Sequence, residues 1–233
     1  MPVIKAVIFD WSGTLVDAYA LSVLRAFTAT FAKYGVTLTP EAIFRDIGLS
    51  KRKHIKLVST EYSSKILPNP DTLYNEYLKH QRTCIETRSK PLPGVRHVLE
   101  DLRRDGVRIG VTTGFPSVIS NEILGKFPVK IDVCVSSDTL PNVSRPQPDM
   151  INECMRVLGI TDKKQVLKVG DTVLDVYEGV NAGCWTAGVY EHSAHVAESN
   201  MQHTVEQLQL AGADFVIREI TQIPKIIRNI EKL

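Results

Sequence analysis

Six short runs of hydrophobic residues, rich in β-branched side chains, recur along the chain and predict β-strands. Several are apolar at consecutive positions, as expected for strands that are buried on both faces of a parallel sheet. Segments with hydrophobic residues at helical spacing follow most of them, and this alternation predicts βαβ units. The predicted strands are residues 3–9, 107–113, 131–135, 165–169, 185–190 and 214–217, and the predicted helices are 94–104, 117–126, 148–158, 172–182, 204–210 and 221–232.

The interval between the first two predicted strands breaks this alternation. It contains four helical patterns and no clear strand: residues 17–34, 40–46, 50–60 and 72–88. Thr39 and Asp71 are expected to cap the second and the last of these helices. We therefore predict an α/β fold with a parallel-sheet core (residues 1–16 and 91–233) and an inserted helical cap (residues 17–90) over the active end of the sheet.

The amino-acid composition excludes some classes of function but does not indicate a particular one. The 233 residues include 28 Lys and Arg against 26 Asp and Glu, a net charge of +2, which gives no electrostatic case for nucleic acid or an anionic membrane. A small anionic substrate remains possible. The apolar run at residues 6–9 is too short for a signal peptide, and the chain has no stretch long enough to cross a membrane. The four cysteines are far apart, so we expect reduced thiols and a cytoplasmic protein.

Candidate chemistry follows the ends of the predicted strands, where ligands bind in open α/β sheets. Asp10 follows the first strand, and Gly13 permits a sharp turn after it. A carboxylate there can hold a cation or act as a nucleophile. Thr113 and Gly114 end the second strand before a helix, an arrangement that suits phosphate oxygens. Taken singly, Asp10 could be a turn residue and Thr113 a helix cap.

Three more charged residues follow later strands. Arg145 lies between turn residues just before a helix, where it is either a fixed cation or a solvated loop residue. Asp171 and Asp175 lie at and just inside a helix N-terminus, where one could be a helix cap and the other a surface residue. Together with Asp10 they offer three hard oxygen ligands, which suits Mg²⁺. Because four successive loops carry such groups, we predict one active site.

This set of residues resembles the haloacid dehalogenase superfamily, and the resemblance covers the whole chain. It implies a Rossmann-like core with a cap, and Asp10 as a nucleophile that forms an aspartyl phosphate. It further implies that Thr113 and Arg145 bind the phosphoryl oxygens. Mg²⁺ would be held by Asp10, the carbonyl of Ser12 and Asp171, with Asp175 supporting the ion.

Two departures narrow the subfamily. Phosphatases and mutases of the superfamily have an acidic residue two positions after the nucleophile, where this chain has Ser12. A serine is a poor general acid at neutral pH. The basic residue is Arg145, where most members have Lys. Both departures are similar to the phosphonoacetaldehyde hydrolases (phosphonatases) and their nearest relatives, as are the runs at residues 10–14 (DWSGT) and 169–172 (VGDT).

The resemblance extends to a lysine in the cap that forms a Schiff base with the substrate aldehyde in that family. It follows a Gly-Leu turn and precedes a His by three positions, and residues 48–54 (GLSKRKH) match with Lys51 and His54. Helical spacing independently places these two on one face with Ile55 and Val58, and leaves Lys53 and Lys56 off it. The ordinary alternative is a solvated basic helix end.

Such an amine, buried beside Arg52 and Lys53, is expected to have a lowered pKa. The resemblance also implies that Gly48, Gly114 and Ser12 line the substrate site and that His54 moves protons. Ile47 and Phe115 replace the Met and Tyr typical of phosphonatases, which affects the surroundings of the substrate.

The implied reaction is Mg²⁺-dependent hydrolysis of the C–P bond of phosphonoacetaldehyde, or of a close 2-oxoalkylphosphonate, to acetaldehyde and phosphate. The resemblance also suggests a homodimer packed through the cap, where Tyr19, Leu21 and Phe27 could lie. Two alternatives stay open. One is a phosphatase acting on a small phosphate ester with another acid, such as His54, and the other is a non-catalytic binding protein.

Overall fold

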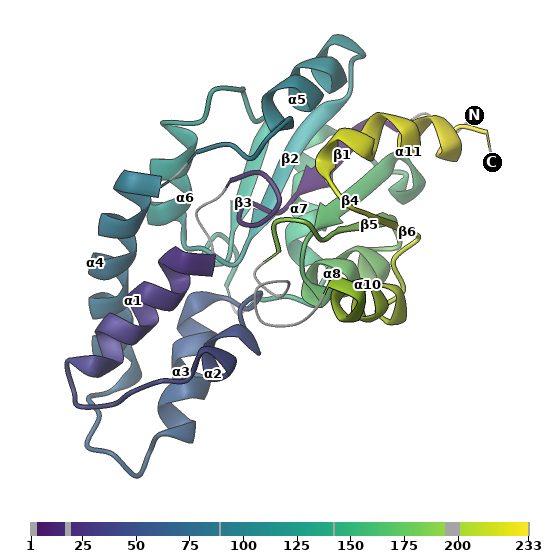
Figure 1. Ribbon diagram of the computed structural model, residues 1–233. Coiled ribbons are helices and arrows are strands. Elements are labelled where there is room, and N and C mark those ends of the chain that lie inside the picture. The colour runs from purple at the N-terminus through teal and green to yellow at the C-terminus, as the bar shows by residue number, and fades with distance from the viewer. Residues whose placement is uncertain (1–3, 17–19, 89, 142, 194–200, 233) are drawn as a thin grey trace.

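The structure, a computed structural model, describes residues 4–16, 20–88, 90–141, 143–193 and 201–232 (Figure 1). Its strands form one parallel sheet in the order β3-β2-β1-β4-β5-β6, which confirms the predicted α/β fold. The strands are β1 (Ala6–Phe9), β2 (Arg108–Thr113), β3 (Val133–Ser136), β4 (Val166–Gly170), β5 (Trp185–Val189) and β6 (Phe215–Ile217). Every predicted strand is present, with boundaries that shift by a few residues.

Helices cover both faces of the sheet because the strand residues are buried on both sides. Val7 and Phe9 of β1 face one hydrophobic cluster, while Ala6 and Ile8 face another. The first face is covered by α5 (Val95–Arg104) and α11 (Ile223–Ile230), and the second by α7 (Asp149–Leu158), α8 (Val173–Ala182) and α10 (Met201–Leu210). The remaining core elements are α6 (Ser117–Leu124), η1 (Lys163–Gln165) and η2 (Ile220–Gln222).

Four helices between β1 and α5 form a separate group at the lower left of Figure 1. They are α1 (Ala20–Ala32), α2 (Pro40–Phe44), α3 (Lys51–Glu61) and α4 (Pro70–Arg88), and α4 packs against both α1 and α3. The chain leaves and re-enters the core side by side, because Val16 pairs with Pro91 and the Leu92 N–H donates to the Leu15 carbonyl over 3.0 Å. The predicted cap boundaries fall at this crossing. That residues 17–90 form a domain of their own stays a prediction.

Of the two expected caps in the helical insertion, one is wrong and the other is confirmed. Asp71 does not cap α4, because the helix begins at Pro70 and already includes Asp71. The Thr72 N–H donates to Oδ1 of Asn69 over 2.8 Å. Asp71 instead forms an ion pair with Arg52. Thr39 does cap α2, with its hydroxyl accepting from the Ala42 N–H.

The expectation that Phe27 lies on a dimer surface is also wrong. Its ring is fully buried inside the cap, with its centroid 4.3 Å from that of His54 and 5.0 Å from that of Tyr77. It therefore stabilises the cap of a single chain. Tyr19 and the side chain of Leu21 lie outside the described residues. A homodimer through the cap stays a prediction, and any such dimer uses residues other than Phe27.

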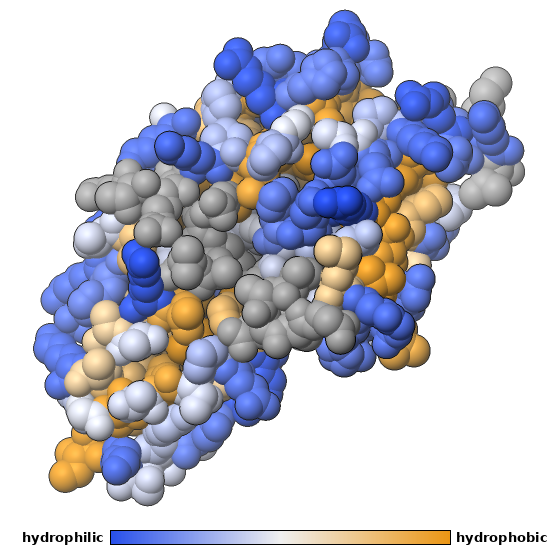
Figure 2. Space-filling model, viewed as in Figure 1, coloured by the Kyte–Doolittle hydropathy of each residue, from blue (hydrophilic) through white to orange (hydrophobic). Residues whose placement is uncertain are grey.

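The surface is mostly hydrophilic on the face shown in Figure 2. The exposed large hydrophobic residues are few: α8 carries Tyr177 and Val180, α10 carries Met201 and Leu210, and the others are Leu57, Ile66 and Val157. Among the described residues, no helix combines the length and the hydropathy needed to cross a bilayer. All four cysteines are free thiols, as expected.

Candidate active site

The strand order places the candidate residues at one point of the sheet. The chain builds β1, β2 and β3 outward in one direction and then continues with β4 on the other side of β1. Phe9 is in register with Val111 of β2 and Val169 of β4, so the loops that follow these strands meet. The Asp10 N–H donates to the Val169 carbonyl over 2.9 Å. Such a reversal of strand order is where open α/β sheets bind ligands.

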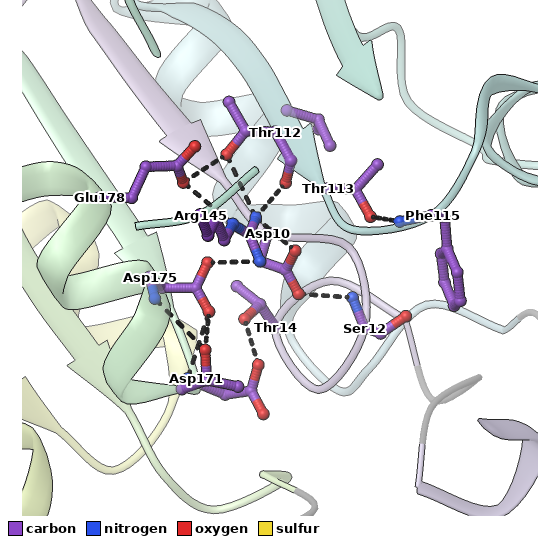
Figure 3. Close-up of polar contacts among 12 residues, drawn as sticks. Asp10, Ser12, Thr14, Thr112, Thr113, Phe115, Arg145, Asp171, Asp175 and Glu178 are labelled. Carbon is purple, nitrogen blue, oxygen red and sulfur yellow. Dashed lines mark hydrogen bonds and ion pairs between the residues drawn. The ribbon is translucent and has the colours of Figure 1, made fainter. Parts of the chain in front are cut away.

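Three carboxylates meet at this point (Figure 3). Asp10, Asp171 and Asp175 are buried, and one oxygen of each lies within 4.8 Å of the others. Asp175 is held by the start of α8: its Oδ2 accepts from the Thr172 hydroxyl over 2.6 Å and from the Thr172 N–H over 3.2 Å. The three predicted ligands therefore converge, although they come from two strand ends and one helix.

Burial and mutual repulsion set the protonation of this cluster. Burial raises the pKa of Asp171 well above its ordinary value, and the charges of Asp10 and Asp175 raise it further. Burial likewise raises the pKa of Asp10, against the opposing charge of Arg145. For Asp175 burial is outweighed by Arg145 and Lys168, so its pKa lies below the usual value. Asp171 is thus the carboxylate that most lacks a compensating charge.

Gly13 lets the loop after β1 fold over Asp171. It has a φ of +81°, a left-handed conformation that favours glycine. A Cβ at this position would also lie 2.5 Å from Oδ2 of Asp171. The Thr14 hydroxyl donates to the other oxygen of Asp171 over 3.4 Å. The glycine is therefore needed both for the turn and for the space around the carboxylate.

Arg145 is fully buried and joins the acidic groups, which excludes the solvated-loop interpretation. Its three nitrogens each lie near a carboxylate: Nη2 2.8 Å from Asp10, Nη1 3.0 Å from Asp175 and Nε 3.1 Å from Glu178. Nη2 also donates to the Thr112 carbonyl over 2.6 Å. Although burial disfavours its charge, these carboxylates raise the pKa of Arg145 well above the normal value. Arg145 is thus a permanent cation whose donors largely serve the protein itself.

Three residues that contact the predicted ones were not predicted: Thr112, Lys168 and Glu178. Lys168, on β4, lies 3.0 Å from Asp175 and 3.1 Å from Glu178, and it donates to the Thr112 hydroxyl over 2.8 Å. A lysine inside an otherwise apolar strand was the available signal, because a buried lysine requires a partner. Glu178 lies three residues after Asp175 on α8, so the two side chains share a helix face.

The chemistry of this cluster fits a divalent cation. Buried ion pairs join Asp10, Asp175 and Glu178 to the cations Arg145 and Lys168, while Asp171 has no ion pair among the described residues. A divalent cation would supply the positive charge that Asp171 lacks. Oδ2 of Asp171 is buried and has no hydrogen-bond partner among the described residues. A free, hard oxygen in an anionic pocket is the ligand type that Mg²⁺ prefers.

Lys51 comes to the same site from the cap. It begins α3, and the predicted face of Lys51, His54, Ile55 and Val58 is buried as expected. Burial lowers the pKa of Lys51 to about 7, with Asp10 opposing this and Arg145 adding to it. The expectation of a lowered pKa is met, but its attribution to Arg52 and Lys53 is wrong because both are exposed. Nζ of Lys51 donates to the Ile47 carbonyl over 2.5 Å.

A small chamber of about 10 Å³ joins the cap to the core. It is lined by Asp10, Ser12, Gly48, Lys51, Thr113, Gly114, Phe115 and Arg145. Thr113 directs its hydroxyl to the Phe115 N–H, from which it accepts over 3.1 Å. The Ser12 hydroxyl is buried and has no hydrogen-bond partner in the described chain. The structure therefore brings all the predicted substrate-binding residues into one cavity.

The two predicted glycines bring the cap close to the core. A Cβ on Gly114 would lie 2.6 Å from the Leu49 carbonyl oxygen, and one on Gly48 would lie 2.9 Å from Leu174. The Lys51 N–H donates to the Gly114 carbonyl over 3.2 Å. Both glycines permit this approach because they lack side chains.

His54 lies behind Lys51 rather than in the chamber. It is buried against Phe27, and neither ring nitrogen has a hydrogen-bond partner of normal geometry in the described chain. Burial, reinforced by the charge of Lys51, lowers the pKa of His54 well below its ordinary value. The ring is therefore neutral at pH 7, and its part in proton transfer stays a prediction.

The fold and the site define a class of hydrolase. The family model for haloacid dehalogenase-like hydrolases matches residues 7–189, and the chain belongs to this family. Within it, the chain is similar to the phosphonoacetaldehyde hydrolase of Bacteroides fragilis, with 31% identity over 258 residues that cover 99% of this chain and 98% of the relative. The enzyme of that name from Paraburkholderia xenovorans is 32% identical over 259 residues, covering 98% and 96%.

Solved structures share the fold. A phosphonoacetaldehyde hydrolase-like protein from Oleispira antarctica superposes with a TM-score of 0.89 at 23% identity, covering 99% of this chain and 93% of that one. A β-phosphoglucomutase from Clostridium difficile gives a TM-score of 0.80 at 17% identity, covering 98% of each chain. The same fold thus serves enzymes with different names, so function must come from the site.

Proposed function

We propose that this hydrolase cleaves the C–P bond of phosphonoacetaldehyde, or of a close 2-oxoalkylphosphonate, to give an aldehyde or ketone and phosphate. The observation that carries the proposal is that Asp10 and Lys51 line the same small chamber. A carboxylate and a lysine amine with a pKa of about 7 are the two nucleophiles that this reaction needs. The names of the relatives with 31% and 32% identity support the same substrate class.

Lys51 would solve the difficulty that a carbanion is a poor leaving group. Its neutral amine condenses with the substrate carbonyl to an imine, releases water and takes up a proton on the imine nitrogen. Asp10 then attacks phosphorus, the C–P bond breaks, and the electron pair passes into an enamine. One water hydrolyses the aspartyl phosphate to phosphate. Protonation of the enamine carbon and hydrolysis of the resulting imine release the carbonyl product and regenerate the amine.

The other residues would hold the phosphonate in place. Thr113 and the remaining donor capacity of Arg145 face the chamber and suit phosphoryl oxygens. We propose Asp10, Asp171 and the carbonyl of Ser12 as Mg²⁺ ligands, with Asp175 behind them. Bound Mg²⁺ would reduce the repulsion between the Asp10 carboxylate and the substrate anion. Ser12 cannot replace a general acid, which is consistent with proton handling by the lysine nitrogen.

Trapping of the imine tests the proposal directly. The protein is incubated with phosphonoacetaldehyde and Mg²⁺, treated with borohydride and digested for peptide mass analysis, while acetaldehyde and phosphate are measured. We expect both products and a reduced adduct on Lys51. Lys51→Arg is expected to lose the adduct and the turnover. Lys65→Arg, a change of an exposed lysine elsewhere in the cap, is the matched control and should keep both.

The phosphatase alternative gives a different result. Turnover of p-nitrophenyl phosphate that survives in Lys51→Arg, with no adduct in the native protein, would favour a phosphatase and overturn the proposal. Such an enzyme would need an acid other than Ser12, and His54 does not line the chamber.

A further inference from the structure

A second and much larger cavity lies outside the catalytic chamber. It has a volume of about 590 Å³ and is open between the cap and the loop formed by residues 137–141 and 143–147. The start of α3 and Tyr74 of α4 form the cap side. This volume falls in the range typical of small-molecule sites. The catalytic chamber itself, at about 10 Å³, holds no more than about one water molecule.

The cap wall of this outer cavity is cationic. Lys53 and Lys56 line it from one side of α3, three residues apart. Both are exposed, and among the described residues neither lies within ion-pair distance of a carboxylate. Arg52 lines it too, but this side chain is already paired with Asp71 and lies over the Tyr74 ring. Two lysine charges are thus free to meet a ligand.

The core wall offers hydroxyl and amide groups from Ser137, Ser144 and Gln147. Its carboxylate, Asp138, is bound elsewhere: it accepts from the Ser117 N–H over 2.7 Å and from the Ser117 hydroxyl over 2.9 Å. The cavity therefore combines two uncompensated ammonium groups with neutral donors, opposed by one engaged carboxylate. This combination favours a small anion rich in oxygen.

The two cavities are neighbours. Arg145 lines both, and Ser50 of the outer cavity precedes Lys51 of the chamber. The Ser50 N–H donates to the Ser144 hydroxyl over 3.3 Å, so a hydrogen bond joins the cap to the core where the cavities meet. An anion on Lys53 and Lys56 would lie next to the chamber without entering it.

We propose that the outer cavity is an anion-binding antechamber, in which Lys53 and Lys56 bind a dianionic phosphonate or phosphate on its way to or from the catalytic chamber. The role in substrate delivery rests on the proposed function. The binding of phosphate does not, because it requires only the two lysines and the cavity.

Lysine protection tests binding without any turnover. The protein is treated with an amine-acylating reagent in the presence of inorganic phosphate or ethylphosphonate, or of sodium chloride at equal ionic strength, and labelling is measured by peptide mass analysis. We expect both anions to slow acylation of Lys53 and Lys56 at least about threefold. Lys225 and Lys232, exposed near the C-terminus, are internal controls and should be unaffected. If the anions slow the acylation of Lys53 and Lys56 no more than that of Lys225 and Lys232, the proposal is overturned. Protection by phosphate alone would restrict the site to the product.

Kinetics then test delivery. Lys53→Gln/Lys56→Gln should lower kcat/KM about tenfold at low ionic strength, retain kcat and lose most of its dependence on salt. Lys225→Gln/Lys232→Gln removes the same charge and should behave as the native protein does. Identical kcat/KM and salt dependence in the two variants would overturn the delivery role. If the native protein instead releases no phosphate from phosphonoacetaldehyde while protection persists, the proposed function has failed and the anion site stands.

Discussion

Nη2 of Arg145 donates to Oδ1 of Asp10 over 2.8 Å, and both residues are buried. The other oxygen of Asp10 accepts from the Ser12 N–H over 3.1 Å. Both oxygens of the proposed nucleophile are therefore fixed before a substrate arrives. Such preorganisation reduces the reorganisation required for an attack on phosphorus.

Replacement of Asp10 should abolish catalysis without destabilising the fold. Asp10→Asn should lower kcat for phosphonoacetaldehyde at least about 10³-fold, since no aspartyl phosphate can form. Because burial raises the pKa of Asp10, its charge disfavours the metal-free fold, so the neutral variant should unfold at an equal or higher urea concentration. Steady-state assays and urea titrations without metal check the two effects. A variant that kept a tenth of the native kcat would exclude Asp10 as the nucleophile.

The pKa of Lys51 predicts a pH dependence in the physiological range. An amine with a pKa of about 7 is largely protonated at pH 6 and largely neutral at pH 8. Reductive alkylation of Lys51 by acetaldehyde and cyanoborohydride should therefore accelerate about tenfold between these pH values. Acetaldehyde carries no phosphonate, so the titration of the substrate does not interfere. Peptide mass analysis gives the rate at each lysine, and acceleration of Lys51 only above pH 9 would contradict the prediction.

Mg²⁺ should stabilise the folded protein through Asp171. At a concentration of 100 Kd, a cation that binds only the folded state adds about 2.7 kcal/mol to the free energy of unfolding. We expect this gain in the native protein and its loss in Asp171→Asn, measured by urea unfolding with and without Mg²⁺. Asp105→Asn, a change at an exposed residue outside the site, should retain the gain. Equal stabilisation of all three proteins would show that the ion binds elsewhere.

The ion pair between Lys168 and Glu178 should respond asymmetrically to mutation. Breaking a buried pair costs about 3–5 kcal/mol. Lys168→Met should cost an amount at the upper end of this range, because Lys168 pairs with both Asp175 and Glu178. Glu178→Gln should cost less, because Lys168 keeps its ion pair with Asp175. Urea unfolding of both single variants and of the double variant gives the coupling, and equal losses that add would contradict this asymmetry.

The approach of the cap to the core can be tested at Gly114. Gly114→Ala would place a Cβ 2.6 Å from the Leu49 carbonyl oxygen, so the cap must shift. We expect kcat/KM to fall about 10²-fold, because small displacements of reacting groups have effects of that size. Gly125→Ala is the matched control: its φ is −63° and its nearest neighbour would lie at 3.4 Å. Similar kcat/KM values for the two variants would show that the cap tolerates the shift.

The residues at the strand ends were predictable, because a parallel sheet brings the ends of neighbouring strands to one edge. Asp10, Thr113 and Asp171 follow from that rule, whereas Lys51 came from the resemblance to the cap motif of phosphonatases, with which the buried face of α3 agrees. The partners of Arg145 were not predictable. Arg145 meets Glu178 because the loop before α7 carries it to Asp10 at the end of β1, and nothing in the local pattern specifies that path.

The cap was harder to place in detail. Asp71 and Asn69 are both good helix caps, and the choice between them depends on Pro70, which favours the first helical position. Phe27 fits a surface stripe as well as an interior one when only its own helix is considered. Its burial comes from its contacts with Tyr77 on α4 and His54 on α3, which lie far along the chain.

The contact between Gly114 and the Leu49 carbonyl has an evolutionary consequence. It joins two backbones, so its geometry does not depend on which side chains the cap displays to solvent. The cap can therefore diversify in sequence, and acquire new substrate preferences, while it still docks in the same place. What selection must preserve at this position is the absence of a methyl group.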